Sequence, residues 1–111
     1  MDWDTANRIH RSIKDAQFDD PHGLREDFYQ RATRYARIRV DWLRSDRETR
    51  NKMDAERTAA HNTFIDACDI LSRQMNLRVL DISWRADLGE NRKEIGDFAC
   101  FIHCILGIEA R

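Results

Sequence analysis

The chain has 111 residues, of which 41% are hydrophobic and 35% are charged, and its net charge is -1. This composition predicts one globular domain over residues 1–111 and excludes a largely disordered chain. The near-zero charge argues against a general nucleic-acid coat protein, because such a protein binds by releasing counterions over a basic surface. A nucleic-acid partner is therefore not expected.

Cysteine usage and hydropathy bear on the compartment. Three cysteines, and no secretory leader in the polar start of the sequence, predict a reducing cytoplasm rather than a disulfide framework. The longest apolar run, Phe98 to Ile108, has 11 residues and contains His103. A membrane span needs about 20 residues, so we expect no membrane association.

Helical spacing of apolar residues predicts a first helix from Trp3 to about Ala16. Asp20-Pro21 indicates an N-cap followed by proline at the first position of a long second helix. Apolar residues recur at steps of three and four and form one face of that helix: Leu24, Phe28, Ala32, Tyr35, Ile38 and Trp42.

Ser45 with Glu48 matches a capping box and predicts a break before a third helix, although one continuous helix through this region is the alternative. The third helix is expected to end near Asn76, with this apolar face: Met53, Ala60, Phe64, Ala67, Cys68, Leu71 and Met75. Leu80, Ile82 and Trp84 alternate with polar residues, which suggests an extended segment. Because the sequence offers no second strand to pair with it, we expect this segment to be a loop. Asp87 with Glu90 is a second capping box and opens the last helix.

The last helix carries apolar residues on every side from Ile95 to Ile108. Such a helix is expected to be buried all round, by the rest of the domain or by another chain. We therefore predict an all-α antiparallel bundle of four helices. A long central hairpin would clasp the buried C-terminal helix, and the first helix would form a lid.

Gly96, Cys100, His103 and Gly107 share one shallow face of the last helix. Interior glycines cost about 1 kcal/mol each relative to alanine, so a close approach of another helix is the expected reason for them. Together with the apolar perimeter of this helix, the face predicts an interface, and a homodimer is the expected assembly.

Thiolate and imidazole are ligands that zinc prefers, so Cys100, His103 and Cys104 could hold zinc with His61 or Cys68 as the fourth ligand. Paired C-x-x-C elements are missing, however, and buried cysteines are common on packing grounds alone. We therefore expect no zinc site.

Two acidic pairs are three residues apart on their helices: Asp66 with Asp69, and Glu94 with Asp97. The run from Glu94 to Ala99 resembles the second acidic motif, E-x-x-D, of the MazG-type all-helical nucleoside triphosphate pyrophosphohydrolases. That resemblance implies magnesium bound by Glu94 and Asp97. The family's first pair, E-x-x-E, has no glutamate version here, and only Asp66 and Asp69 stand in a suitable place. The alternative is that Glu94 and Asp97 pair with arginines of a neighbouring helix.

A second resemblance is to a family of small all-helical bacterial proteins without an established activity. It rests on Arg57, Ala60-His61-Asn62, Ile65, Leu71 and Ser72-Arg73 in the third helix, with Ile95 to Ala99 in the last. It implies a fold and no chemistry.

Between Arg31 and Lys52, eight basic residues face three acidic ones. Guanidinium groups suit phosphate or carboxylate recognition. Three acid-first pairs four residues apart instead favour a self-paired, solvated helix face: Asp27 with Arg31, Asp46 with Arg50, and Glu48 with Lys52. The expected function is a non-catalytic protein-interaction or regulatory module in the cytoplasm, without a cofactor. The alternative is a magnesium-dependent nucleoside triphosphate pyrophosphohydrolase.

Overall fold

The computed structural model describes residues 2–75 and 92–109, apart from the side chains of residues 92–94 and 108–109. This part of the chain holds four helices and no strand: α1 (Trp3–Asp15), α2 (Leu24–Arg44), α3 (Arg47–Met75) and α5 (Arg92–Glu109). The all-α fold class is confirmed. The predicted loop at Leu80 to Trp84 and the capping box of Asp87 with Glu90 lie outside the described residues.

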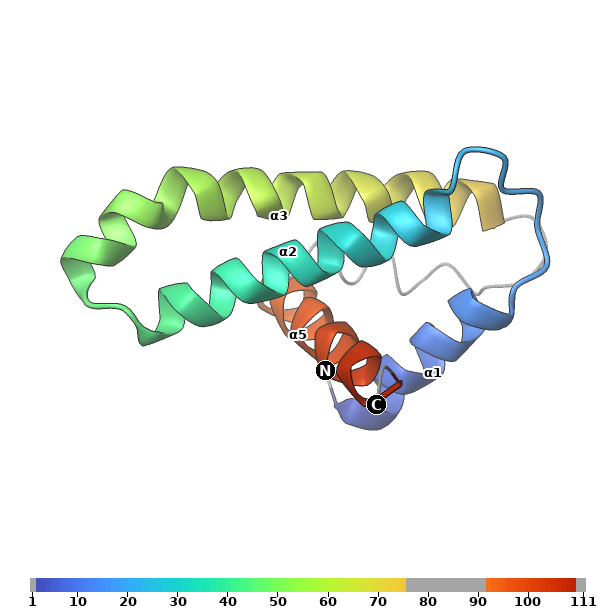
Figure 1. Ribbon diagram of the computed structural model, residues 1–111, viewed down its shortest axis with the longest axis horizontal. Coiled ribbons are helices and arrows are strands. Elements are labelled where there is room, and N and C mark those ends of the chain that lie inside the picture. Colours follow the sequence, from blue (N-terminus) through green and yellow to red (C-terminus); the bar gives the residue numbers. More distant parts are fainter. Residues whose placement is uncertain (1, 76–91, 110–111) are drawn as a thin grey trace.

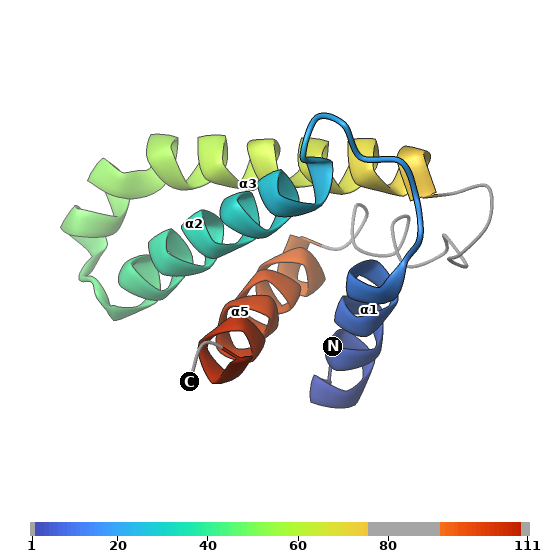
Figure 2. The ribbon, with the colours of Figure 1, turned by 45° about the vertical axis from the view of Figure 1, so that its right-hand side comes forward.

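The four helices form two layers. The antiparallel helices α2 and α3 make a long hairpin, and α5 packs against α2 at a steep angle (Figure 1). Helix α1 packs against α5, so α1 and α5 together lie beneath the hairpin (Figure 2). The predicted hairpin with a C-terminal helix against it and the first helix as a cover is therefore confirmed. None of the described helices is both long enough and apolar enough to cross a membrane.

Helix α1 begins where predicted, and its cap is Asp2, whose carboxylate accepts a hydrogen bond from the Thr5 N–H at 2.7 Å. This bond satisfies one of the amide groups that a helix leaves free at its start. The buried stripe of the helix is Ala6, Ile9, His10 and Ile13.

The start of α2 differs from the prediction. Residues 20–23 form a turn in which the Gly23 N–H donates to the Asp20 carbonyl at 3.3 Å, and the helix begins only at Leu24. Gly23 has a φ of 66°, a left-handed conformation that favours glycine. The Asp20 carboxylate still accepts from the N–H groups of Leu24 (2.7 Å) and Arg25 (3.2 Å). Asp20 therefore caps the helix from outside it, and Pro21 is not its first residue.

The break between α2 and α3 is confirmed, but its cap is Asp46 rather than Ser45. The Asp46 carboxylate accepts from the Thr49 N–H at 2.8 Å, whereas Ser45 ends α2 and its hydroxyl donates to the Asp41 carbonyl at 2.6 Å. The predicted pair of Asp46 with Arg50 is wrong, because the Arg50 guanidinium bonds to the end of α2 instead.

The Arg50 guanidinium instead closes the end of α2. It donates to the carbonyls of Trp42 and Leu43, both at 2.8 Å, and lies 4.5 Å above the Trp42 ring. Arg57 lies 4.9 Å from the same ring. Free carbonyls at the end of a helix interact favourably with a cation. The Arg50 guanidinium at the end of α2, together with the cation–π contacts to Trp42, therefore stabilises the hairpin turn.

Aromatic rings from three helices form the centre of the core. Phe28 of α2 lies 5.5 Å from Phe64 of α3 and 6.3 Å from Phe98 of α5, and Phe64 lies 6.2 Å from Phe98, all between ring centroids. All three are fully buried. The predicted faces of α2 and α3 point into this core, with Leu24, Ile38, Trp42 and Met53 half-buried at its margin.

Burial of the C-terminal helix is confirmed on one side only. Its buried face consists of Ile95, Gly96, Phe98, Ala99, Ile102 and Ile105. On the other side Cys104 and Gly107 are exposed, and Phe101 is half-buried. Among the described elements, α1 and the α2–α3 hairpin cover one sector of α5, so burial by the rest of the domain holds for that sector. Burial of the remaining sector by another chain stays a prediction.

Candidate functional site

The carboxylates of the predicted magnesium site are only partly described. Asp66 is exposed and Asp97 is half-buried. Asp69 forms an ion pair with Arg73 of the same helix, at 2.9 Å. The side chain of Glu94 is among those not described. Within residues 2–75 and 95–107, no three His, Cys, Asp or Glu side chains come together as a metal site would require. The described carboxylates alone therefore do not fit a magnesium ion, and no step of chemistry follows from them.

The cysteines and histidines of the zinc hypothesis are also dispersed. Cys68 is buried, Cys100 half-buried and Cys104 exposed, and none forms a disulfide. Burial raises the pKa of the Cys68 thiol far above its ordinary value, and burial also raises that of Cys100, although the nearby Arg39 opposes the shift. Raised values disfavour the thiolate, which is both the nucleophile and the metal ligand.

The predicted small-residue face of α5 meets a side chain rather than a helix. A Cβ built on Gly96 would lie 2.6 Å from Cζ and 2.8 Å from Cδ of Arg39, whose guanidinium crosses over this glycine from α2. Arg39 also donates to the Tyr35 hydroxyl at 3.5 Å. Among the described residues, no atom beyond the adjoining backbone of α5 comes within 4 Å of a Cβ built on Gly107, and Cys100 and His103 are half-buried between these ends. Whether this face contacts another chain stays a prediction.

The arginine-rich stretch is only partly self-paired. Arg31 pairs with Asp27 at 3.0 Å and Lys52 with Glu48 at 3.7 Å, as predicted. Arg34 and Arg37 are exposed and form no ion pair with any side chain that the structure describes. Arg34 and Arg37 therefore remain available to a partner, as does the exposed Arg44 at the end of α2.

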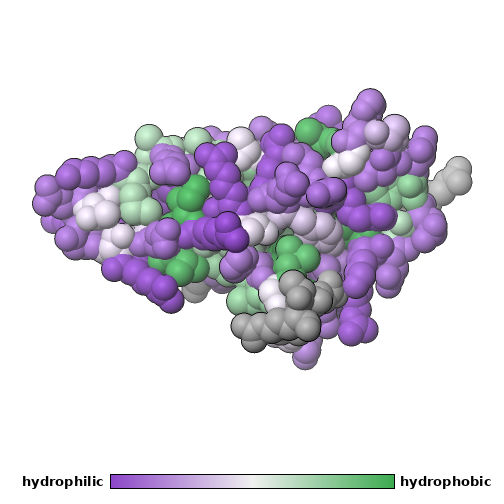
Figure 3. Space-filling view, viewed as in Figure 1, coloured by the Kyte–Doolittle hydropathy of each residue, from purple (hydrophilic) through white to green (hydrophobic). Residues whose placement is uncertain are grey.

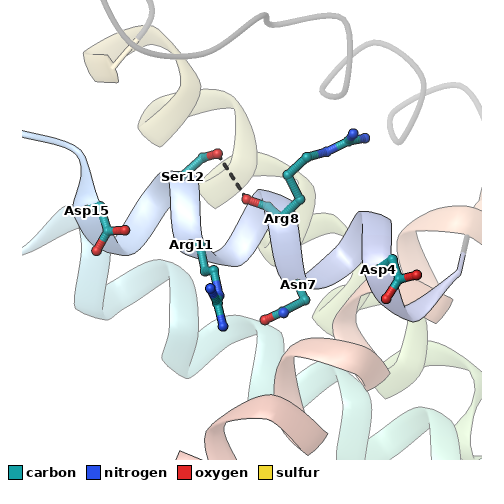
Figure 4. Close-up of a pocket in the computed structure, with 6 residues that line it drawn as sticks. All are labelled: Asp4, Asn7, Arg8, Arg11, Ser12 and Asp15. Atoms are coloured by element: carbon teal, nitrogen blue, oxygen red, sulfur yellow. Dashed lines mark hydrogen bonds between the residues drawn. The ribbon is translucent and has the colours of Figure 1, made fainter.

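A polar hollow of about 510 Å³ lies on the outside of α1. Its described lining comes from this one helix: Asp4, Asn7, Arg8, Arg11, Ser12 and Asp15. Figure 4 shows Arg8 and Arg11 pointing in opposite directions, with the Ser12 hydroxyl bonded to the Arg8 carbonyl at 2.9 Å. These side chains do not converge, so they do not form a binding site.

A second hollow, of about 590 Å³, has lining from three helices, and we name it the α2 groove. Most of its residues lie on the outer side of α2, with one residue each from α3 and α5: Glu26, Tyr29, Gln30, Thr33, Arg34, Arg37, Ile38, Glu56 and Leu106. Its surface is more apolar than polar. Tyr29, Ile38 and Leu106 are half-buried, whereas its charged residues are exposed.

Tyr29 is held in place from α1. Its hydroxyl lies 3.0 Å from Nδ1 of the buried His10 and donates to the His10 carbonyl at 3.4 Å, and the two rings meet edge to face at 5.5 Å. Its ring also meets Phe28 at 5.2 Å. These contacts fix one edge of the groove rigidly, which lowers the entropy cost of binding there.

The α2 groove was not predicted from the sequence. The available signal was a second stripe on α2, with Glu26, Gln30, Thr33 and Arg37 spaced four, three and four apart. Polar stripes of this kind occur on every solvated helix, so the spacing alone does not distinguish a binding face from a wet one. On the face shown in Figure 3, hydrophobic residues form small separate patches among hydrophilic ones, so no broad apolar surface marks a site there.

Comparisons of the chain with protein-family models, with curated proteins and with solved structures find no match.

Proposed function

We propose that this protein is a non-catalytic helical module that binds protein in the cytoplasm and assembles as a homodimer. The observation that carries the proposal is the α2 groove, in which an apolar floor is surrounded by exposed charges of both signs.

The composition of the groove supports protein rather than small-molecule binding. Half-buried Tyr29, Ile38 and Leu106 offer apolar contact, and exposed Arg34 and Arg37 can form charged hydrogen bonds. Tyrosine and arginine are enriched in protein interfaces, where an apolar centre is enclosed by a polar rim. A small-molecule site would instead enclose most of its ligand, and this groove is open to solvent.

The free thiols support the proposed compartment. All three cysteines are unpaired, and Cys104 is exposed. An exposed thiol persists in the reducing cytoplasm and is oxidised readily outside it.

Two measurements test the proposal. Sedimentation equilibrium should give twice the 13.2 kDa of one chain, and a constant mass of 13.2 kDa at high concentration would remove the homodimer. A turnover screen over nucleoside triphosphates with magnesium should show no hydrolysis. Hydrolysis that depends on magnesium and is abolished by Asp97→Asn would overturn the non-catalytic assignment in favour of a pyrophosphohydrolase.

A matched control belongs with that screen. Asp54→Asn changes an exposed carboxylate of α3 that pairs with Arg57 at 3.0 Å and belongs to neither acidic pair. Loss of turnover in Asp97→Asn but not in Asp54→Asn would exclude a contaminating enzyme as the source of the activity.

A further inference from the structure

Charges along the α2 groove are arranged with opposite signs at its two ends. Glu26 lies in the first turn of α2, and Arg37 lies eleven residues later on the same side of the helix. At a rise of about 1.5 Å per residue, they are about 16 Å apart along the helix axis. Both side chains are exposed. Within the described residues Glu26 forms no ion pair, and its carboxylate accepts one long hydrogen bond, from the Gln30 amide at 3.4 Å.

We infer that the occupant of the α2 groove is the same groove of a second copy, with the two α2 helices packed antiparallel about a twofold axis. This inference rests on the proposed homodimer. It adds which surface forms the dimer interface and which residues of the two α2 helices face each other. The axis would pass beside α2 at the level of Arg31 and Ala32, midway between Glu26 and Arg37.

The groove is complementary to itself under that operation. An antiparallel twofold at this level places Glu26 opposite Arg37 of the partner subunit. It also places Tyr29 opposite Arg34 of the partner subunit, and Gln30 opposite Thr33 of the partner subunit. The first is an ion pair, the second a cation–π contact, and the third a hydrogen-bonding pair. Six of the seven lining residues that α2 contributes therefore find a partner, Ile38 being the exception, and because the interface is isologous each contact occurs twice.

A second copy fits these charges better than an acidic peptide does. The groove holds two exposed arginines, Arg34 and Arg37, but also two exposed glutamates, Glu26 and Glu56. An acidic segment lying along the groove would satisfy the arginines and be repelled by the glutamates. A surface that carries both signs in mirrored order selects a partner with the same order reversed, which is its own copy.

Charge reversal provides the test, because it predicts both a loss and a specific rescue. Glu26→Arg places two arginines opposite each other in the homodimer, and Arg37→Glu places two glutamates opposite each other. Each single variant should weaken self-association by about tenfold or more at low salt, and less at high salt. The double variant Glu26→Arg/Arg37→Glu should associate as the wild type does.

Mixing the two single variants gives the sharper result. A chain with Glu26→Arg carries arginine at both ends of the groove, and a chain with Arg37→Glu carries glutamate at both ends. The mixture should therefore form a heterodimer tighter than either homodimer, measured by sedimentation equilibrium on one labelled and one unlabelled chain. A change in folding of either variant could not produce this rescue.

The control variants are Glu48→Arg and Lys52→Glu. These residues form an exposed ion pair on α3, with side chains 82% and 77% exposed, and they do not line the groove. Their reversal should leave the association constant unchanged. Thermal unfolding of each variant accompanies these measurements, because Glu26 also favours the N-terminus of α2 through the helix dipole.

The outcomes separate the inference from the proposed function. A dimer whose association is insensitive to both single reversals would overturn the α2 register and leave the homodimer standing. A wild-type chain that stays monomeric would overturn both. Magnesium-dependent nucleotide hydrolysis would overturn the non-catalytic function without affecting the register.

Discussion

Phe98 is the residue of the C-terminal helix whose ring joins the aromatic centre of the core, so its truncation should be the most informative single change. Its ring is fully buried and lies 6.3 Å from Phe28 of α2 and 6.2 Å from Phe64 of α3. Phe98→Ala removes apolar area from both contacts and leaves a cavity that fully packed neighbours can fill only in part.

The expected loss is about 3–5 kcal/mol in the free energy of unfolding. Domains of this size are stable by about 5–15 kcal/mol, so the loss is a large share of the total. The midpoint of thermal unfolding should fall by about 12–25 °C. Urea unfolding followed by far-UV circular dichroism measures the loss directly.

Phe101 provides the matched comparison on the same helix. Its ring is half-buried and meets the ring of Trp3 edge to face at 5.8 Å, but it lies away from the aromatic centre of the core. Phe101→Ala should cost about 1–2 kcal/mol. Phe98→Leu, which retains most of the volume, should cost less than Phe98→Ala and remain measurable if the alanine variant unfolds.

The comparison has a clear refutation. If Phe98→Ala lost no more stability than Phe101→Ala, the inward face of α5 would be assigned to the wrong residues. The packing of this helix against the hairpin would then need a different rotation.

Three further predictions concern local features. Gly107→Ala should stabilise the protein by up to about 1 kcal/mol, because alanine favours the helix and its Cβ would meet none of the described side chains. Gly96→Ala should gain less, because the Arg39 side chain must move away, and thermal unfolding compares the two variants. The Thr49 amide holds the pKa of Asp46 below its ordinary 3.8, so the stability from this cap is present above pH 3.8 and is lost as the pH falls through the folded value. Asp46→Asn retains a capping oxygen that does not titrate, so its free energy of unfolding should fall less than that of the wild type as the pH drops below 3.8. An equal fall in both proteins would exclude the Asp46 carboxylate as the cause of the acid destabilisation. A thiol reagent at neutral pH should label Cys104 rapidly and Cys68 only on unfolding, because burial raises the pKa of Cys68; mass spectrometry after peptide mapping would read the order, and early labelling of Cys68 would contradict the core assignment.

The sequence by itself determined the helices of the described chain and their inward faces. Spacing of three and four placed Phe28 and Tyr35 on one face of α2 and Phe64 and Leu71 on one face of α3, and all four are buried. Helical periodicity follows from backbone geometry, so it can be seen without knowledge of the neighbours. The capping signals were less exact. Ser45, Asp46 and Asp20 could each accept a backbone N–H, and only the path of the turn selects which one does.

Only the tertiary structure decided which sides of the helices remain open. Apolar residues surround α5, but α1 and the hairpin cover one sector of it and leave Cys104 and Gly107 exposed. The same holds for the α2 groove, which needs Leu106 of α5 and Glu56 of α3 beside residues of α2. Burial and concavity are properties of how helices meet across long sequence separations. The local order of residues sets only the periodicity of each helix, so burial and concavity cannot be determined from it.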